Sequence, residues 1–301
     1  MSSRGEVLAE PYPIVEVKPE WTIEDEAMGG REKFWYEIPD DQQRWLFKYP
    51  RAGTGEHWAE KIAAEVADGL GILHAAVDLA VFRGERGSVT RSFARRRREL
   101  SHGNELLAWH RPYDAHKRFG QSDHTAGNIL EALEAVFTTR HGARTAKRQF
   151  AGYLVLDALI GNTDRHHENW GLLLRWIQSR LHGFLAPTFD HASSLGRELS
   201  DQKRRARLAN ENVGDYSERG RGGVFWTNSG RYGPSPLELV RRSAAEYPDL
   251  FGVPLVRVRE RRSRFEEIVR AVPGDWMSPT AKDFTVALLD YNASELKRCL
   301  M

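Results

Sequence analysis

Residues 161–169, Gly161-Asn162-Thr163-Asp164-Arg165-His166-His167-Glu168-Asn169, are the densest polar stretch in this chain of 301 residues. An apolar segment with helical periodicity precedes the stretch at about 143–160, and an apolar segment typical of a strand follows it at 170–176. A loop held between two buried elements has its side chains fixed in direction. The stretch therefore predicts a site in which polar groups are aimed at a ligand.

The acids and amides in and after this loop have the arrangement that phosphoryl transfer requires. Asp164 and Asn169 are five residues apart, and a second acid, Asp190, follows the expected strand pair. One carboxylate can orient an attacking hydroxyl and accept its proton, while an amide and a second carboxylate hold Mg²⁺ against phosphates. An Asp-x4-Asn pair alone is weak evidence, so its value depends on the rest of the chain.

The first ninety residues predict a small β-rich lobe with one helix. Short segments rich in aromatic and branched side chains, bounded by Gly, Pro or Asp, predict strands. Between them, Trp58, Ile62, Val66 and Leu70 recur every four residues, which predicts one face of a helix. The expected strands are 14–17, 33–38, 44–49, 77–82 and 88–93, and the expected helix is 56–70.

After about residue 120 the pattern becomes helical. Helices are expected from a cap at Ser122 or Asp123 to Phe137, and over 143–160, 236–246, 254–272 and 279–300, with a hairpin over 170–176 and 181–185 and a loop over 214–233. We expect an α+β chain of two lobes, with a small β-rich N-lobe over 1–98 and a larger, mainly helical C-lobe over 99–301. Ligands often bind in the cleft between two such lobes.

The small lobe contains residues that could hold phosphates. Strand alternation puts Trp45 and Phe47 on one face, and Leu46 and Lys48 on the other, which we expect to point inward. A lysine there can reach nucleotide phosphates, and an acid on the next helix, Glu60 or Glu65, can hold it in place. Gly29 and Gly30, between two strands, would let backbone amides approach phosphate oxygens.

These parts, in this order, resemble the HipA-like kinases, relatives of the protein-kinase and phosphatidylinositol 3/4-kinase folds. The specific motifs are residues 159–169 and Ala186-Pro187-Thr188-Phe189-Asp190-His191-Ala192-Ser193-Ser194, and the resemblance covers roughly residues 25–250. The fold that it implies is the two-lobed protein-kinase-like fold.

The resemblance also implies a role for each matching residue. Asp164 would be the catalytic base, Asn169 and Asp190 the Mg²⁺ ligands, Lys48 the phosphate-binding lysine, and Glu60, rather than Glu65, its paired acid. The implied nucleotide-binding residues are Gly29, Gly30, Arg31, Lys33, Lys48, Ser92 and Phe93, of which the first four lie in a Gly-x-x-Glu-Lys phosphate loop and the last two at the strand end that meets adenine.

The implied activity is that of an ATP- and Mg²⁺-dependent serine/threonine protein kinase of the HipA toxin type. Its substrate would be a protein, with a translation factor or an aminoacyl-tRNA synthetase as candidates, and an antitoxin is a candidate partner. Two features depart from the family. Only about 25 residues precede the glycine loop where many relatives carry an extra subdomain, so a short form is expected. Glu26 stands where several relatives carry an autophosphorylated serine.

Three other functions fit parts of the pattern. A kinase of the same fold could phosphorylate a lipid or a small molecule. Asp164 with His166, His167 and His191 could instead bind Zn²⁺ or Mn²⁺ in a phosphohydrolase. Adjacent histidines in an extended loop point apart, however, and Lys48 and Glu60 would have no role. A pseudokinase is the third alternative, and the presence of every catalytic residue type argues against it.

Composition excludes several broader classes. Lys and Arg number 44 against 42 for Asp and Glu, so charge gives no sign of direct nucleic-acid binding. No apolar run approaches the ~18 residues of a membrane span, and no membrane association is expected. The single cysteine, Cys299, excludes an intramolecular disulfide and fits a reducing compartment, so we expect a cytoplasmic protein.

Overall fold

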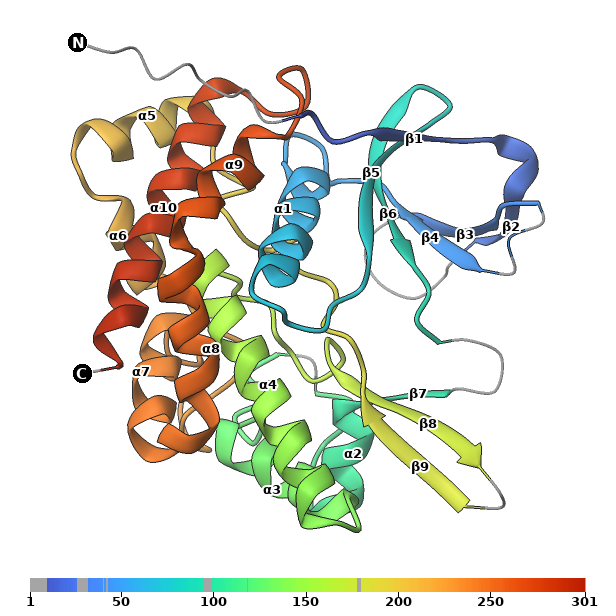
Figure 1. Cartoon of the computed structure of the whole chain (residues 1–301), viewed down its shortest axis with the longest axis vertical. Coiled ribbons are helices and arrows are strands. Elements are labelled where there is room, and N and C mark those ends of the chain that lie inside the picture. Colours follow the sequence, from blue (N-terminus) through green and yellow to red (C-terminus); the bar gives the residue numbers. More distant parts are fainter. Residues whose placement is uncertain are drawn as a thin grey trace.

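The computed structural model describes residues 10–25, 32–39, 41, 43–94, 99–117, 119–177 and 180–300. A curled sheet and one helix form the N-terminal part, and helices form most of the C-terminal part (Figure 1). The expected α+β architecture of two unequal lobes is confirmed.

The N-terminal sheet has six strands in the order β1-β5-β6-β4-β3-β2. β1 pairs with β5 in parallel, and the other neighbours are antiparallel. Five strands lie where the sequence predicts them, to within a few residues. β2 was not predicted, because its sequence, Thr-Ile-Glu-Asp, lacks the alternation of a half-buried strand. The bounds are β1 Ile14–Val17, β2 Thr22–Asp25, β3 Lys33–Glu37, β4 Arg44–Lys48, β5 Val77–Phe82 and β6 Glu85–Arg91.

Aromatic rings fill the inside of the curled sheet. Phe34, Phe47 and Phe82 pack there, with ring centroids 5.1 Å apart for Phe34 and Phe47 and 4.5 Å apart for Phe34 and Phe82. The deepest burial in β4 is therefore at Phe47, which is 0% exposed. The opposite face, which carries Lys48 as expected, points toward the helix and the other lobe.

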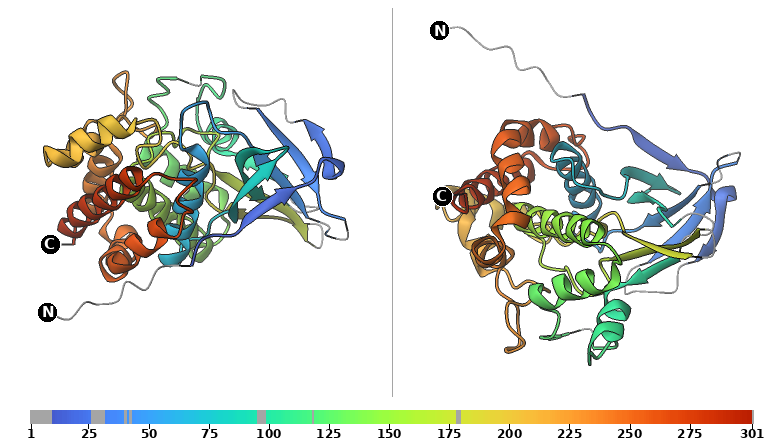
Figure 2. Two further views of the ribbon diagram at one scale, coloured as in Figure 1. Left: turned by 90° about the horizontal axis from the view of Figure 1, so that it is seen from above. Right: turned by 60° about the horizontal axis from the view of Figure 1, so that its bottom comes forward.

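Helix α1 (Glu56–Gly69) lies between the sheet and the C-terminal helices (Figures 1 and 2). Trp58, Ile62 and Val66 are buried as the four-residue spacing predicts, and they join the main core of the protein. Because the helix is covered on both sides, most of its residues are buried, including two glutamates of its first turns. A buried glutamate needs a charged or hydrogen-bonding partner, and this requirement determines the site described below.

The C-terminal part is built around α4 (Arg140–Ile160), which contacts α3, α7, α8 and α10. A small antiparallel sheet, β7-β8-β9, packs beside it (Figure 1). The remaining elements are β7 Glu99–His102, α2 Gly103–His110, α3 Ala126–Val136, β8 Gly171–Ile177, β9 Arg180–Leu185, α5 Asp201–Ala209, α6 Val213–Arg219, α7 Pro236–Glu246, α8 Pro248–Arg261, α9 Phe265–Arg270 and α10 Pro279–Arg298, with short 3-10 turns η1 Pro19–Trp21 and η2 Arg262–Arg264.

Two helix boundaries differ from the prediction. The helix expected over 254–272 begins instead at Pro248. A proline fits the first turn of a helix, because the N–H that it lacks would have no partner within the helix there. The turn η2 separates α8 from α9. Pro254 therefore lies inside α8. Helix α3 is capped by Thr125 instead of Ser122 or Asp123, because the Thr125 hydroxyl accepts a hydrogen bond of 3.0 Å from the backbone N–H of Asn128.

Helices α5 and α6 were not predicted. Basic and polar side chains hide the apolar pattern of α5, and its first turn is fixed by Ser200, whose hydroxyl accepts from the N–H of Lys203. Helix α6 occupies the start of the stretch expected as a loop over 214–233. No helix in the described ranges is both long and apolar enough to cross a bilayer.

Contacts at the back of the cleft join the two lobes. Tyr12, ahead of β1, donates its backbone N–H to Ala271 O at 2.9 Å and its hydroxyl to Ile268 O at 3.0 Å. Arg257 of α8 donates to the carbonyls of Leu70 and Gly71 at the end of α1, both at 3.1 Å. These bonds tie the segment ahead of β1 and the C-terminal end of α1 to the C-terminal helices.

Candidate active site

The polar loop begins where α4 is forced to end. Gly161 adopts φ +66°, in the left-handed region that favours glycine, and its N–H closes the helix on Asp157 O. Within the loop, the N–H of Asp164 donates to Asn162 Oδ1 at 3.1 Å, and Asn169 Nδ2 donates to Asp164 O at 2.7 Å. The spacing of five residues between Asp164 and Asn169 is thus a closed turn that fixes the backbone of Asp164 and the side chain of Asn169.

A buried ion pair supports this loop from beneath. Arg165 donates to both oxygens of Asp157, at 2.7 and 2.8 Å, and the side chains are 2% and 4% exposed. Asn162 Nδ2 donates to the same carboxylate at 2.7 Å. The partners of the Asp157 carboxylate are thus side chains and not backbone groups, because a carboxylate so deeply buried is well matched by a bidentate guanidinium.

The same guanidinium connects the two segments that carry the predicted metal ligands. Arg165 Nη1 donates to Asn169 O at 2.6 Å and to Phe189 O at 3.4 Å, directly before Asp190. One rigid side chain therefore holds Asn169 and Asp190 next to each other. Sequence reasoning missed this function of Arg165, although a lone acid on an apolar helix eight residues earlier was a signal that a cation must pair with it.

Lys48 meets one acid from each lobe. Its Nζ lies 3.4 Å from Glu60 Oε1 of α1 and 3.2 Å from Asp190 Oδ1. The Glu60 side chain is 1% exposed and that of Asp190 is 30% exposed, so the second carboxylate faces the cleft. Glu65, the alternative partner, instead binds Lys61 at 2.6 Å. The structure brings Lys48, Glu60 and Asp190 together, as the sequence predicts.

Asp190 has an unusual backbone conformation. Its φ of +59° lies in the left-handed region, which costs an L residue roughly 1–2 kcal/mol and is tolerated best by Asn and Asp. Such strain gathers at functional sites, where the surrounding contacts hold it in place. Nearby, Ser193 Oγ donates to Asp164 Oδ2 at 3.2 Å, which connects the segment after Asp190 to the polar loop.

The cleft-facing side of the sheet has two lysines opposite one another. Lys33 of β3 is in register with Lys48 of β4, and both lie on the face opposite the aromatic core. On the neighbouring strand, a Cβ at Gly87 would lie only 2.6 Å from Lys48 O, so only glycine lets β6 approach here.

The residues at the end of β6 lie where the polypeptide crosses between the lobes. Thr90 is buried on the Lys48 side of the sheet, and its hydroxyl has no hydrogen-bond partner among the described residues. Ser92 donates its backbone N–H to Arg44 O at 2.8 Å, and the ring of Phe93 lies 5.3 Å from that of Phe189. Phe93 thus connects this crossing to the segment that carries Asp190.

Three predicted residues of the phosphate loop, Gly29, Gly30 and Arg31, lie outside the described residues, as does Glu26. Their roles stay predictions.

The donor atoms of Asn169 and Asp190 fit Mg²⁺. Both side chains offer oxygen, which hard divalent cations prefer. The amide nitrogen of Asn169 is already used by Asp164 O, so its oxygen is the atom left for a cation. Mg²⁺ is usually held by one or two carboxylates plus substrate phosphates, and the arrangement matches that sparse donor set.

The histidines of the loop do not converge on a metal. His167 Nδ1 lies 2.7 Å from Tyr113 Oη, and His191 Nε2 lies 2.8 Å from Thr188 Oγ1. Burial, followed by the nearby Arg165, holds the pKa of His191 well below its usual range. Within the described part of the chain, no cluster of three or more His, Cys, Asp or Glu could hold a metal ion. The histidine-based phosphohydrolase therefore lacks a metal centre in this region.

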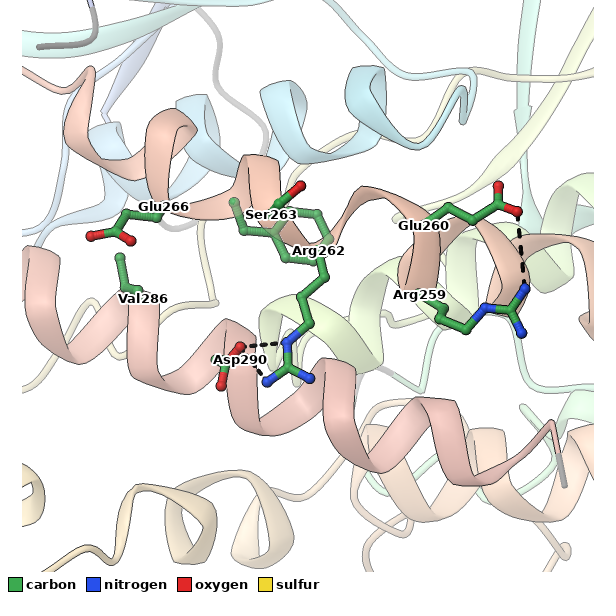
Figure 3. A pocket seen from close by; sticks show the side chains of 8 residues that line it. Arg259, Glu260, Arg262, Ser263, Glu266, Val286 and Asp290 are labelled. Carbon is green, nitrogen blue, oxygen red and sulfur yellow. Dashed lines mark hydrogen bonds and ion pairs between the residues drawn. The ribbon is translucent and has the colours of Figure 1, made fainter. Parts of the chain in front are cut away.

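A surface hollow of about 440 Å³ lies elsewhere, between η2 with α9 on one side and α10 on the other (Figure 3). Its charges largely neutralise one another, since Arg262 pairs with Asp290 and Arg259 lies near Glu260. It brings together no nucleophile, base or metal ligand set. Lys48, Asp164 and Asp190 lie outside it.

Comparisons with known proteins agree with this geometry. The family model described as "HipA-like C-terminal domain" matches residues 26–276. The crystal structure of the Helicobacter pylori proinflammatory kinase CtkA is similar, with a TM-score of 0.75 and 19% identity over 96% of this chain and 97% of that one. HipA from Shewanella oneidensis MR-1, in a toxin–antitoxin complex with HipB and operator DNA, has a TM-score of 0.60 and 13% identity over 91% of this chain and 64% of its own. Among curated proteins, none matches the sequence.

Proposed function

Because the chain belongs to the family of the HipA-like C-terminal domain, we propose that it is an ATP- and Mg²⁺-dependent kinase that phosphorylates serine or threonine hydroxyls of a protein. The family and the kinase-like fold support a phosphotransferase. The observation that carries the proposal further is the position of Lys48, with Glu60 of one lobe at 3.4 Å and Asp190 of the other at 3.2 Å.

Each residue of the cleft has a chemical role in this proposal. Asp164 orients the acceptor hydroxyl and accepts its proton. Asn169 and Asp190 would hold Mg²⁺, which supplies neutralisation of the charge that develops on the phosphates. Lys48 binds phosphate oxygens and is itself oriented by Glu60. Arg165 touches neither substrate nor metal, and it fixes the positions of Asn169 and Asp190 from below.

Two features of the small lobe support a nucleotide as the phosphate donor. Lys33 and Lys48 are paired across β3 and β4, so both ammonium groups could reach the same chain of phosphates. The buried hydroxyl of Thr90 lacks a protein partner among the described residues, and a nucleobase edge could satisfy it beside Ser92 and Phe93. Gly29, Gly30 and Arg31 complete the phosphate loop in this proposal.

A protein acceptor in the cytoplasm belongs to the same proposal, with a translation factor or an aminoacyl-tRNA synthetase as candidates. The similar HipA chain was solved in a toxin–antitoxin complex, and this supports looking for an antitoxin that binds the present chain. A lipid or small-molecule acceptor is the alternative that the experiment must separate.

The test uses purified protein with γ-labelled ATP, Mg²⁺ and a cell lysate, followed by separation of proteins, lipids and small molecules. Asp164→Asn removes the proposed base. Asp249→Asn is the matched control, since Asp249 is an 85% exposed surface acid paired with Arg144. We expect labelled phosphoserine or phosphothreonine in protein bands with the wild type and Asp249→Asn, and none with Asp164→Asn. Label confined to lipids or small molecules, or unchanged with Asp164→Asn, would overturn the proposal.

A further inference from the structure

Arg197 connects the two lobes at the N-terminal end of α1. It lies seven residues after Asp190, and its side chain is 14% exposed. Its Nη1 pairs with Glu56 Oε1 of the small lobe, and its Nη2 donates to Ser193 Oγ at 3.2 Å. Its backbone carbonyl accepts from the N–H of Gly55 at 2.9 Å. Neither the family's catalytic motifs nor the roles assigned above include this residue.

On the small-lobe side, Arg197 holds the start of α1. Glu56 opens the helix and is 3% exposed, so its carboxylate depends on partners within the protein. Glu60 lies one turn later on the same helix and binds Lys48. Because a helix moves as a rigid rod, the contact at Glu56 also sets the position of Glu60 relative to the large lobe.

On the large-lobe side, Arg197 reaches Asp164 through one hydroxyl. Ser193 Oγ accepts from Arg197 Nη2 and donates to Asp164 Oδ2 at 3.2 Å. A serine hydroxyl has one proton, and occupation of its lone pair by the guanidinium directs that proton toward the carboxylate. The bond restrains one oxygen of the Asp164 carboxylate, and the orientation of a base contributes to its catalytic effect.

We propose that Arg197 is a positioning residue that couples the docking of α1 on the large lobe to the orientation of the Asp164 carboxylate. The same contacts of Arg197 then place the Lys48–Glu60 pair of the small lobe and orient the carboxylate of Asp164. Arg197 acts through Glu56 and Ser193 and touches no reacting atom. This inference rests on the proposed kinase function.

Arg51→Met provides a matched control for Arg197→Met. Arg51 donates to the same Glu56 carboxylate, through its backbone N–H at 2.9 Å and its Nη1 at 3.4 Å, but its side chain is 54% exposed. The backbone contact survives the substitution, and no described contact joins Arg51 to Ser193.

We expect Arg197→Met to lower kcat at least roughly tenfold with the KM for ATP changed less than about threefold, because alignment in the transition state is lost and ground-state binding is not. Arg51→Met should keep kcat within about threefold of the wild type. Arg197→Lys should recover part of the lost kcat, because its ammonium group can pair with Glu56 but cannot reach Ser193 at the same time as the forked guanidinium does.

Double-mutant cycles test the coupling itself. We expect Arg197→Met and Ser193→Ala together to lower kcat by clearly less than the product of the single losses, because Arg197 acts on Asp164 through Ser193. We expect the same for Arg197→Met with Glu56→Gln, because Arg197 acts on α1 through Glu56. Additive losses in either cycle, or a loss that appears entirely in KM, would overturn the coupling. If Arg197→Met does not fold, Arg197→Lys with Ser193→Ala carries the first cycle. Absence of phosphotransfer by the wild type would instead count against the proposed function.

Discussion

The small lobe contains two lysine clusters built from the same residue types. Lys48 joins Glu60 of α1 to Asp190, and Lys61 joins Glu65 of α1 to Asp78. Lys61 lies 2.6 and 2.9 Å from its two carboxylates and donates to Val77 O at 3.0 Å. The two carboxylates of Lys48 are farther away, at 3.4 and 3.2 Å, and one of them comes from the other lobe.

The difference shows what separates a structural lysine from a functional one. An ammonium group has three donors, and Lys61 places all three on short contacts within the small lobe. The contacts of Lys48 are longer, and the Asp190 carboxylate is 30% exposed to the cleft. Phosphate oxygens can therefore replace a carboxylate at Lys48 without disturbing the core, whereas Lys61 has nothing to gain from a ligand.

The largest expected effect separates the two clusters by activity. Lys48→Met should lower phosphotransfer turnover by roughly two to three orders of magnitude, the usual loss when one preorganised donor to developing charge is removed. Lys61→Met should keep turnover within about tenfold, since its contacts do not reach the cleft. The rate of labelled-phosphate transfer at saturating ATP, measured for both variants, checks the pair. Equal turnover in the two would refute the distinction.

The next effect is on the free energy of unfolding, and it compares Lys48 with the buried pair of Asp157 and Arg165. Asp157→Leu leaves the guanidinium of Arg165 buried without its carboxylate, and it should lower the free energy of unfolding by about 3–5 kcal/mol. Lys48→Met should lower that free energy by less than Asp157→Leu does, because it removes single contacts of 3.4 Å to Glu60 and 3.2 Å to Asp190 and not a bidentate pair. Urea denaturation followed by tryptophan fluorescence measures both. A small loss for Asp157→Leu would contradict the role assigned to the buried pair.

We expect the loss of folding stability in acid to come from buried histidines and not from the residues around Lys48. His124 donates from Nδ1 to Gly223 O at 2.8 Å and accepts from Trp170 Nε1 at 3.0 Å, and burial lowers its pKa to about 3. The folded protein holds this histidine neutral, whereas the unfolded chain binds a proton there once the pH falls below 6.5, the ordinary pKa of a histidine. Its contribution to stability is complete above that pH and is lost as the pH falls from 6.5 toward 3.

The check compares the wild type with His124→Asn. The difference between their free energies of unfolding should be largest at pH 7.5 and should shrink as the pH is lowered to 5. The same dependence should persist in Lys48→Met, which leaves His124 untouched. A difference that does not change with pH would show that His124 is not held neutral by the fold.

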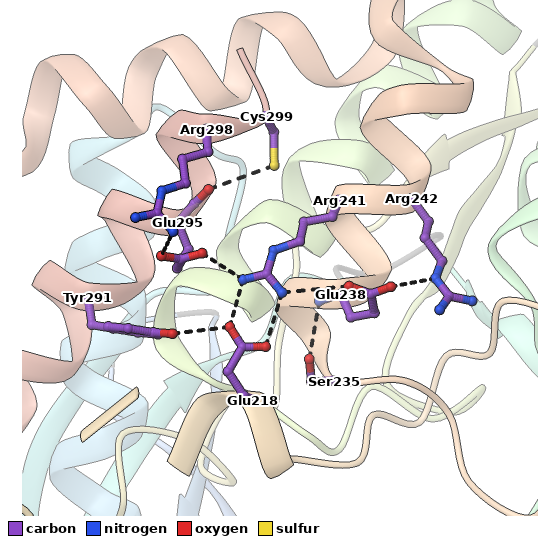
Figure 4. Close-up of polar contacts among 9 residues, drawn as sticks. All are labelled: Glu218, Ser235, Glu238, Arg241, Arg242, Tyr291, Glu295, Arg298 and Cys299. Atoms are coloured by element: carbon purple, nitrogen blue, oxygen red, sulfur yellow. Dashed lines mark hydrogen bonds and ion pairs between the residues drawn. The ribbon is translucent and has the colours of Figure 1, made fainter. Parts of the chain in front are cut away.

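The smallest effect is expected in a network among α6, α7 and α10 (Figure 4). Arg241 donates to both oxygens of Glu218 and to Glu295, and its hydrogen bond holds the pKa of Glu218 below its usual range. The side chains of Arg241 and Glu218 are 30% and 35% exposed, so Glu218→Gln should lower the free energy of unfolding by at most about 1 kcal/mol.

This loss should be present above a pH of about 4.5 and should disappear as the pH falls through the lowered pKa, because the carboxylate is then protonated in both forms. Denaturation at pH 7 and at a series of pH values below 4.5 follows the loss. A loss that grows in acid would contradict the assigned charge state.

The sequence predicted the parts of the fold and site that depend on local pattern. Alternating aromatics located β3 and β4, and the spacing of Trp58, Ile62 and Val66 located α1. The motif order predicted that Lys48, Glu60 and Asp190 would meet, and they do.

The rest depends on contacts that no local pattern contains. The Arg165–Asp157 pair forms because Gly161 turns the chain back on its own helix, and the Arg197–Glu56 pair joins residues 141 positions apart. Helix α5 was missed because its buried residue is an arginine, Arg204, whose guanidinium lies 5.7 Å from the ring of Trp58. A charged side chain that packs like an apolar one leaves no apolar periodicity to read.

The central claim is that Lys48, Asn169 and Asp190 gather around one metal-bound nucleotide. A crystal structure with a non-hydrolysable ATP analogue and Mn²⁺, located by its anomalous signal, tests it most directly. We predict the ion at about 2.0–2.3 Å from oxygens of Asn169 and Asp190, with Lys48 on the phosphates. A nucleotide bound elsewhere, or an ion that neither side chain touches, would contradict the account.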